Sequence, residues 1–558
     1  MSSSPIPLPA VAVLGTGLVS ALLVTVFPEQ LPGHPLLLVA SVLLGIEAVL
    51  FGIYKILIYP TFISQLRTLP VPGGNLPIVG HGLAAFERPP GRSFGKWMRE
   101  VPNDGLIRFY GFFNSDRVLL VSPKALGELL VSKTYDFEKP KPARDFLRKI
   151  LGDGLIIVEG DVHKFQRKNI MPIFSFRSIK ELYPIFWDKS MQLVQGVAQQ
   201  IAENPEQSGD SKSKTSVVEI NHWANQVTMD IIGLAAMGRD IQALKNSDDP
   251  LVQKYEEILE PTVEKQIFFL ISLLFPGDWV SYLPWGVVKR FNHLVPSLNQ
   301  ICLDFIRTKK EKMKTNPDNK DILSLLLRSN NFSDEQLVDQ LLTFLAAGHE
   351  TTSSAFTWSG FLLSKHPEIQ VALREEVHKN VPSPKQPLSS DTDLASILES
   401  LPLLNGVCNE VLRLYPTVPT TVRWAVRDTS LVGHPIPSGT ELILSPWTIN
   451  RSTELWGPDA EEFVPKRWID VDESTGEERP NNSGGAPSNY ANLTFLHGPR
   501  SCIGQGFAKA ELRALVATFV GSFDIAMADP DEVVIPHGVV TTKPKNGMNL
   551  RLRKLDGW

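Results

Sequence analysis

The stretch Phe495-Leu496-His497-Gly498-Pro499-Arg500-Ser501-Cys502-Ile503-Gly504 is the most informative part of this chain. It contains the pattern Phe-x-x-Gly-x-Arg-x-Cys-x-Gly, which chance seldom assembles. Glycines at 498 and 504 favour a tight turn and a close approach of the backbone to a flat ligand. An apolar helix is expected to begin near Gly506, and its N-terminal dipole favours Cys502 as an anion. We therefore interpret Cys502 as a thiolate ligand rather than a small buried thiol.

The composition of the chain is that of a packed globular protein. It has 558 residues, of which 43% are hydrophobic and 21% charged, and its formal net charge is −5. This balance gives no reason to expect a nucleic-acid partner. The three cysteines are too few and too scattered for a disulfide framework, and Cys302 and Cys408 lie in apolar, helix-like contexts where buried thiols are expected.

Two further motifs lie upstream of the cysteine stretch. One is Glu410-Val411-Leu412-Arg413 and the other is Phe463-Val464-Pro465-Lys466-Arg467. With all three motifs, the chain resembles the cytochrome P450 superfamily in its membrane-anchored, microsomal form. The residues within the motifs are similar to those of fungal members. The resemblance implies that Cys502 is the axial ligand of the iron of haem b. It also implies that Glu410, Arg413 and Arg467 form a buried structural triad that clamps the cysteine loop, where loss of one partner would leave a buried charge.

The resemblance also carries a fold and an activity. It implies a mainly α fold with small β-sheets over residues 61–558. A haem-thiolate monooxygenase of this kind oxidises a lipophilic small molecule with O2. Because the sequence has no convincing nicotinamide or flavin motif, the electrons are expected from an NADPH-cytochrome P450 reductase, with cytochrome b5 as a further candidate donor.

The hydrophobic periodicity of the body agrees with a mainly helical fold. Helices are predicted at 185–202, 218–237, 295–314, 333–365, 366–379 and 505–521. Short strands are predicted at 106–110, 117–121, 441–445 and 548–553. The polar segments 203–215 and 478–490 are predicted to be surface loops.

The longest predicted helix carries a second chemical signal. Ser333 and Gln336 form a capping-box pattern at its start, and Ala347-Gly348-His349-Glu350-Thr351-Thr352 lies midway. Glycine and β-branched hydroxyl residues weaken a helix, so we expect a bulge here beside the cofactor. By the resemblance, Thr351 and Glu350 are the catalytic pair that delivers protons during oxygen activation.

Further residues are expected to hold the haem. Arg500 and Arg423 are candidate partners of the propionates, and the family's Trp-x-x-x-Arg segment corresponds to His163-Lys164-Phe165-Gln166-Arg167. His163 replaces the tryptophan but can still donate a hydrogen bond, and the fork of Arg167 suits a carboxylate. The remaining residues assigned to the cofactor are Phe495, Gly498 and Gly504 of the cysteine stretch.

The first 60 residues differ from the body. Residues 6–27 carry no charge and residues 35–54 carry only Glu47. Each run approaches the ~20 residues needed to cross a bilayer, and no basic segment precedes the first, which argues against a cleavable signal peptide. We expect a membrane anchor of one or two spans at 1–60, in the endoplasmic reticulum, with the catalytic domain in the cytoplasm.

The partner and the substrate are the least specified parts of the interpretation. Lys164, Lys168 and Arg177 suggest a basic surface for an acidic reductase. By family analogy the pocket draws on Phe344, Ala347, 134–156, Thr417–Val422 and Val540–Thr542, which mostly lean apolar.

An apolar pocket favours a terpenoid or polyketide of secondary metabolism, or a fatty acyl chain or xenobiotic. Two other classes stay open: a reductase-independent haem-thiolate isomerase or dehydratase, and a non-enzymatic membrane haem carrier.

Overall fold

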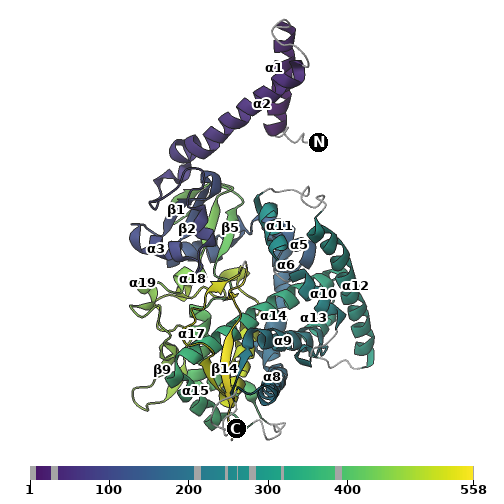
Figure 1. The fold of residues 1–558 in the computed structure, drawn as a ribbon, viewed down its shortest axis with the longest axis vertical. Helices are drawn as coiled ribbons and strands as arrows, with labels where there is room; N and C mark the ends of the chain where they lie inside the picture. Colours follow the sequence, from purple (N-terminus) through teal and green to yellow (C-terminus); the bar gives the residue numbers. More distant parts are fainter. Residues whose placement is uncertain are drawn as a thin grey trace.

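In the computed structural model, two N-terminal helices project from a large body (Figure 1). In that view the body divides into a helix-rich side and a side rich in strands and loops. The structure describes residues 8–26, 35–206, 215–245, 249–259, 262–274, 285–315, 320–383, 392–538, 540–556 and 558. Residues 207–214, most of the predicted loop 203–215, lie outside the described residues.

Helices account for most of the body. The helices are α1 (Leu8–Val26), α2 (Pro35–Ile53), α3 (Arg92–Glu100), α4 (Pro123–Gly127), α5 (Lys141–Leu151), α6 (Gly160–Ile170), α7 (Phe176–Lys180), α8 (Tyr183–Glu203), α9 (Ile220–Ile232), α10 (Pro250–Leu259), α11 (Val263–Leu274), α12 (Gly286–Thr315), α13 (Ile322–Ser329), α14 (Asp334–Lys365), α15 (Pro367–Asn380), α16 (Leu394–Ser400), α17 (Pro402–Leu414), α18 (Pro446–Ile449), α19 (Thr453–Trp456) and α20 (Gln505–Ser522). The mainly α fold expected from the sequence is confirmed.

The strands form small sheets. Their bounds are β1 (Leu106–Tyr110), β2 (Asp116–Leu120), β3 (Phe137–Glu138), β4 (Thr215–Glu219), β5 (Thr421–Ala425), β6 (Thr429–Leu431), β7 (His434–Ile436), β8 (Glu441–Leu444), β9 (Ile469–Val471), β10 (Glu478–Pro480), β11 (Phe523–Met527), β12 (Pro536–His537), β13 (Lys543–Pro544) and β14 (Asn549–Lys554). The largest sheet has the order β1-β2-β8-β5-β3, and a three-stranded sheet has the order β11-β14-β4. In the largest sheet β2 and β8 pair in parallel and the other neighbours are antiparallel. The sheet joins β1, β2 and β3 to β5 and β8, which lie about 300 residues later in the sequence.

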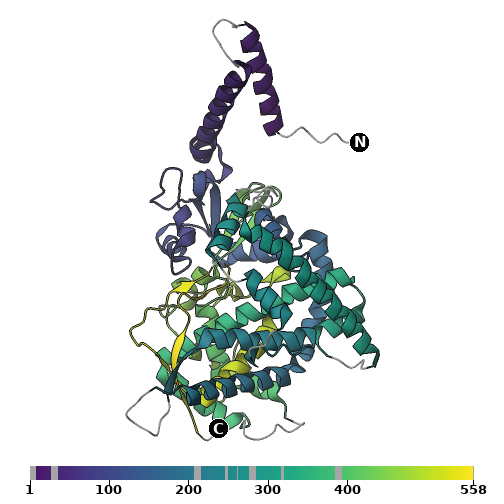
Figure 2. The same ribbon diagram turned by 45° about the vertical axis from the view of Figure 1, so that its right-hand side comes forward.

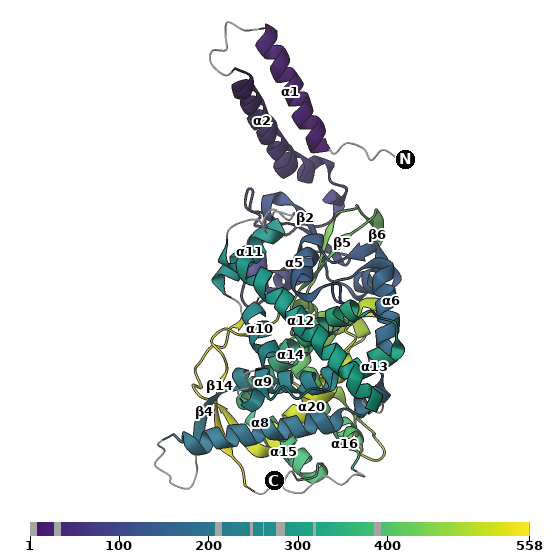
Figure 3. The same ribbon diagram turned by 90° about the vertical axis from the view of Figure 1, so that its right-hand side faces the viewer.

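Helix α14 is the central element of the helical side (Figure 3), where it contacts α9, α12 and α20. Its length follows from strong end signals. Ser333 and Gln336 form the capping box reciprocally, acidic residues occupy the first turn, and Lys365 lies in the last. The predicted capping box and the predicted helix are both present, and most of the side chains of α14 are buried in the main apolar core.

Several predicted elements have different ends. The helix predicted at 218–237 begins at Ile220, because residues 215–219 form the edge strand β4 beside β14. The helix predicted at 295–314 begins earlier, at Gly286, and includes Pro296. The loop predicted at 478–490 opens with β10, which pairs with β9. The differences at β4 and β10 arise from pairing with other strands, which local periodicity does not encode.

The N-terminal helices form a hairpin that stands clear of the body (Figure 2). The second helix continues through a π-helical turn at Tyr54–Ile63, and the segment Leu36–Ile63 is long and apolar enough to cross a membrane. Thr16 on α1 donates a hydrogen bond from Oγ1 to the Glu47 carboxylate on α2, 2.7 Å away. The one acidic residue of the second apolar run is therefore paired inside the hairpin.

Candidate functional site

The cysteine loop closes on itself before α20 begins. The Cys502 backbone N–H donates to the Phe495 carbonyl over 2.8 Å, and Ser501 N–H donates to the Gly498 carbonyl over 3.0 Å. Helix α20 then starts at Gln505, where the helix predicted at 505–521 begins, with Gly504 as its N-cap. Cys502 is solvent-accessible, whereas Cys302 and Cys408 are buried, as expected for structural thiols. The loop therefore presents its thiol to open space at a helix N-terminus.

The backbone conformation and the surroundings differ between the two glycines of the cysteine loop. Gly498 has φ of +74°, and a Cβ there would lie 2.1 Å from the Leu130 carbonyl oxygen. Gly504 has φ of −88°, and a Cβ there would meet only Phe174, at 3.9 Å. The turn expected at both positions therefore requires glycine at Gly498 alone, and the protein leaves open room beside Gly504.

Glu410, Arg413 and Arg467 meet in the interior. Arg413 donates to both carboxylate oxygens of Glu410, over 2.7 and 2.8 Å, and Arg467 Nε donates to Glu410 Oε1 over 2.9 Å. Trp468 Nε1 adds a 2.8 Å hydrogen bond to Glu410 Oε2. Glu410 and Arg413 are fully buried, so the Glu410 carboxylate is removed from water. The hydrogen bonds from Arg413, Arg467 and Trp468 replace those that water would make.

Asn450, which the sequence interpretation missed, joins this triad to the cysteine loop. Its side-chain nitrogen donates to the Arg413 carbonyl (3.0 Å) and to Thr494 Oγ1 (2.9 Å). Its side-chain oxygen accepts the Leu493 N–H over 2.8 Å. The buried side-chain amide of Asn450 therefore connects the triad to Leu493 and Thr494, the two residues that precede Phe495 of the cysteine loop. No pattern in the sequence marks Asn450, because its role exists only after distant segments come together.

A cluster of buried cations lies beside the loop. Arg500, Arg423 and Lys139 share one carboxylate, that of Glu159, which forms ion pairs with Arg500 and with Lys139. Three cations against one anion leave a surplus of two positive charges. Burial, together with repulsion from Arg500 and against attraction by Glu159, lowers the pKa of Arg423 to about 10 and that of Lys139 to about 8.

This cluster fits a ligand that carries two carboxylates, as haem does. The Arg500 side chain is only 4% exposed, yet none of its three nitrogens makes a hydrogen bond with any residue described in the structure. A buried guanidinium without well-aligned acceptors is costly, and two propionates would supply acceptors and neutralise the surplus. Glu159 and Lys139 belong to this cluster and were missed from the sequence, where neither stands in a recognisable motif.

His163 and Arg167 lie on the same face of α6, one turn apart. Arg167 donates from Nη1 to the Ser501 carbonyl (2.6 Å) and from Nη2 to Ser501 Oγ (3.2 Å). His163 Nδ1 lies 3.4 Å from the Tyr135 hydroxyl, and Tyr135 also lies under the Arg500 guanidinium. Burial, followed by repulsion from Arg500, lowers the pKa of His163 to about 4, so the ring is neutral at physiological pH.

The middle of α14 is continuous helix, so the predicted bulge is wrong. Thr351 donates from Oγ1 to the Ala347 carbonyl over 2.6 Å. Gly348 instead lets Ile232 of α9 pack closely, because a Cβ there would lie 2.6 Å from Ile232 Cδ1. Glu350 accepts a 2.7 Å hydrogen bond from Thr541 and lies 3.8 Å from Lys543 Nζ. The carboxylate and the Thr351 hydroxyl are therefore adjacent in sequence and held by different partners.

The segments expected to surround a substrate meet at this point of α14. Thr542 N–H donates to the Thr417 carbonyl over 2.8 Å, and the Thr417 hydroxyl lies 3.4 Å from the Thr351 carbonyl. Ala347 is exposed, as expected for a pocket residue. Phe344 is buried, and its ring lies against that of Phe174, with ring centroids 5.5 Å apart.

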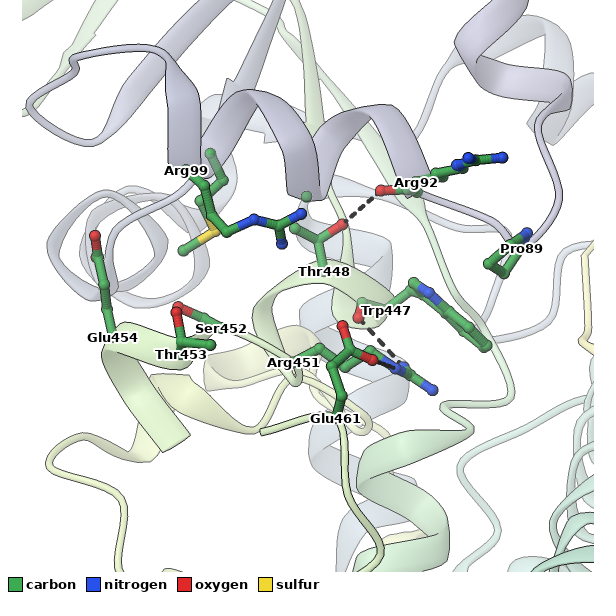
Figure 4. A pocket seen from close by; sticks show the side chains of 13 residues that line it. Pro89, Arg92, Arg99, Trp447, Thr448, Arg451, Ser452, Thr453, Glu454 and Glu461 are labelled. Carbon is green, nitrogen blue, oxygen red and sulfur yellow. Dashed lines mark hydrogen bonds and ion pairs between the residues drawn. The ribbon is translucent and has the colours of Figure 1, made fainter. Parts of the chain in front are cut away.

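A separate small cavity lies between α3 and α18 (Figure 4). It has a volume of about 180 Å³ and contains Arg451, which stacks on Trp447 at 3.7 Å and pairs with Glu461 at 3.3 Å. None of the residues that line it belongs to the cysteine loop or to the cation cluster.

Comparison with known proteins agrees with this geometry. The cytochrome P450 family matches residues 70–550. The chain is similar to the cytochrome P450 monooxygenase sphH of Aspergillus fumigatus, with 40% identity over 91% of each chain. It is also similar to the cytochrome P450 monooxygenase FUM15 of Gibberella moniliformis, with 38% identity over 90% of this chain and 91% of the relative. The cytochrome P450 monooxygenase ptmK of Penicillium ochrochloron is 37% identical over 90% of this chain and 96% of its own. With its accessible cysteine, its clamped loop and its surplus of buried cations, this chain belongs to the cytochrome P450 family of haem-thiolate monooxygenases.

Proposed function

We propose that the chain is a membrane-anchored monooxygenase in which Cys502 ligates the iron of haem b. The observation that carries this proposal is the surplus of buried positive charge beside an accessible cysteine, which calls for a metal-bearing ligand with two carboxylates. Arg500 and Arg423, with Lys139, hold the propionates, and Gly504 leaves room for the flat ring. Arg167 supports the cysteine loop through Ser501, and His163 borders the cluster through Tyr135.

The test is the spectrum of the purified, reduced protein under carbon monoxide. Thiolate ligation gives a strongly red-shifted Soret band, and Cys502→Ser removes it. Cys408→Ser is the matched control, because Cys408 is a buried thiol whose pKa is raised to about 12 by burial. A red-shifted band that survives Cys502→Ser would overturn the assignment.

When bound, the haem supplies oxygen activation, and its thiolate ligand favours O–O cleavage. The chain supplies the proton path. With haem bound, the Thr351 hydroxyl, which here donates to the Ala347 carbonyl, would hand on protons for the oxygen chemistry, and Glu350 would supply them from the side of Thr541 and Lys543. The presence of this pair favours a monooxygenase over a reductase-independent isomerase or dehydratase.

We propose that an NADPH-cytochrome P450 reductase docks over the cysteine loop, with cytochrome b5 as a further donor. Helix α6 bonds to the cysteine loop and α7 contacts α20, and the exposed basic and apolar side chains of these two helices and the turn between them are called the proximal surface. Its members are Val162, Lys164, Phe165, Lys168, Met171, Phe176, Arg177 and Lys180. Basic side chains around an apolar centre suit an acidic partner that must approach the ligand side of the haem.

The docking proposal is tested with the double variant Lys164→Glu/Lys168→Glu. Reductase-driven NADPH oxidation at low salt should fall at least about tenfold, whereas peroxide-driven turnover is unchanged. Lys312→Glu is the control, because Lys312 is an exposed lysine on α12. Equal rates in the three proteins would contradict the docking site.

We propose a lipophilic substrate from secondary metabolism, of terpenoid or polyketide type, with a fatty acyl chain or xenobiotic as the alternative. Support comes from the accessible Ala347, from the apolar segments that meet at Thr351, and from relatives that are fungal monooxygenases. Screening compounds for a shift of the ferric spin state tests this proposal. A preference for highly polar ligands would contradict it.

We propose that residues 1–60 anchor the catalytic domain, residues 61–558, to the endoplasmic reticulum membrane as a two-helix hairpin. The Thr16–Glu47 hydrogen bond supports two spans, because an ionisable group in a bilayer needs a partner. Both ends of a hairpin then face the cytoplasm. Protease protection of an N-terminal tag in intact microsomes would contradict this topology.

A further inference from the structure

Glu511 is a buried carboxyl group that the proposed mechanism does not use. It lies on α20, the helix that begins directly after the cysteine loop, and only 1% of its surface is exposed. Its helix neighbours belong to the main apolar core, among them Ala510 and Leu512. Neither of its carboxyl oxygens makes a hydrogen bond by strict geometry with any residue that the structure describes.

The polar group that acts on Glu511 is the hydroxyl of Thr352 on α14. Thr352 follows the proposed catalytic residue Thr351 and is 2% exposed. Burial raises the pKa of Glu511 well above its usual range, while the Thr352 hydroxyl acts in the opposite direction. No charged group among the described residues contributes to this shift, so nothing compensates an ionised carboxylate there.

The hydroxyl of Thr352 behaves differently from its neighbours on α14. Thr351 donates to Ala347, Ser353 donates to the Glu350 carbonyl over 3.0 Å, and Thr357 donates to the Ser353 carbonyl over 2.8 Å. Thr352 Oγ1 is buried and makes no such bond to its own helix. Its hydroxyl is thus left available to the carboxyl group that faces it from α20.

We propose that Glu511 is held as a neutral carboxylic acid that bridges to the Thr352 hydroxyl and fixes α14 against α20. In this bridge the carboxyl O–H is the donor and Thr352 Oγ1 is the acceptor. Glu511 is a positioning residue, because it acts through Thr352 and the packing of the two helices. It sets how Thr351 on one helix stands relative to Cys502 at the start of the other.

Infrared difference spectroscopy of the full-length protein in detergent at pH 8 tests the bridge. At that pH ordinary carboxyl groups are ionised, so a protonated carboxyl gives a C=O band that stands alone. The band should be present in the wild type and absent in Glu511→Gln. Thr352→Val should shift its frequency, whereas Thr357→Val, a buried threonine of the same helix, should leave it unchanged. A missing band, or a band that Thr352→Val does not move, would overturn the proposal.

A second measurement tests positioning and rests on the proposed monooxygenase function. The fraction of NADPH-derived electrons released as hydrogen peroxide should rise about threefold or more in Glu511→Leu and Thr352→Val. Glu511→Gln should restore the wild-type fraction, because an amide also donates to a hydroxyl. An unchanged fraction in both apolar variants, while the wild type shows the infrared band, would overturn the positioning role. Failure of the monooxygenase assignment would instead leave the infrared result intact and abolish reductase-driven turnover altogether.

Discussion

Arg167 donates a 2.6 Å hydrogen bond from Nη1 to the carbonyl of Ser501, the residue directly before Cys502. The arginine of α6 therefore holds the cysteine loop itself, and its second bond goes to the Ser501 hydroxyl. The family resemblance assigns this arginine to a haem propionate, a role that the hydrogen bonds to Ser501 do not require.

We predict that Arg167→Gln loosens the loop and lowers the haem content of the purified protein at least about threefold, because a charge-assisted hydrogen bond is lost. Haem per protein is measured from the pyridine haemochrome. Lys168→Gln on the same helix is the control, because Lys168 is exposed at the surface. Equal haem content in both variants would contradict the supporting role.

The two glycines of the loop give a matched pair of predictions. Gly498→Ala should prevent the loop from closing, because the new Cβ collides with the Leu130 carbonyl at a positive φ. Gly504→Ala should leave the stability of the haem-free protein unchanged, since the Cβ meets no protein atom closer than 3.9 Å.

Gly504→Ala should nevertheless lower haem affinity if the ring lies against this residue. Haem titration and urea unfolding separate the two effects. Wild-type haem affinity in Gly504→Ala would show that the cofactor does not approach the backbone there.

We predict that Glu410→Gln destabilises the protein by about 3–5 kcal/mol, because it leaves the buried guanidinium of Arg413 without its carboxylate. The urea midpoint and the yield of folded protein measure this loss. Glu477→Gln serves as the control, because its ion pair with Arg479 is largely exposed and should change stability little. A midpoint that is the same in both variants would mean that the buried triad is not required for folding.

We predict that Thr351→Val retains haem and the carbon monoxide band but lowers product formation about a hundredfold. Electrons should leave as peroxide instead, because the proton path is broken while oxygen reduction continues. The assay uses a substrate found by the spin-state screen and measures product and peroxide together. Full coupling in Thr351→Val would remove this hydroxyl from the mechanism.

His349 makes stability sensitive to acid. Burial lowers its pKa to about 3, from 6.5 in an unfolded chain. Between these two pKa values the histidine is protonated in the unfolded state and neutral in the folded state. The free energy of unfolding therefore decreases as the pH falls from 6.5 toward 3.

Between pH 7 and pH 5 this contribution amounts to about 2 kcal/mol, which His349→Leu should remove from the wild-type pH dependence. His163, whose pKa is lowered to about 4, adds a decrease of the same sign that the variant keeps. Urea unfolding at the two pH values measures the difference. Parallel pH profiles would contradict the prediction.

Much of the fold can be predicted because its signals are local. The capping box of Ser333 and Gln336, the apolar periodicity of α20 and the run of strand-forming residues in β1 each depend on neighbours in sequence. The end of strand β4 has an apolar periodicity that predicts the start of a helix. It is extended instead because it pairs with β14, which lies far along the chain. From the sequence alone, Gly348 predicts a weakened helix. In the structure the helix is continuous, and the missing side chain makes room for Ile232.

The site divides in the same way. Residues inside compact motifs, such as Cys502, Glu410 and Arg413, can be identified from the sequence alone. Asn450 and Glu159 cannot, because each bonds to partners that only folding brings together. The motif does indicate Arg167, but the bond to Ser501 depends on how α6 lies against the loop.

Arg413 reaches the neighbouring loops through their main chain. Its guanidinium donates to the carbonyl oxygens of Asn450, Ala460 and Glu462, over 2.7, 2.6 and 3.0 Å. A carbonyl is present whatever the side chain, so the exposed residue at 462 is free to vary without loosening its contact, whereas Ala460 is fully buried beside Trp456 and Trp468. Directed evolution could therefore randomise position 462 and leave the packed interior around Arg413 intact.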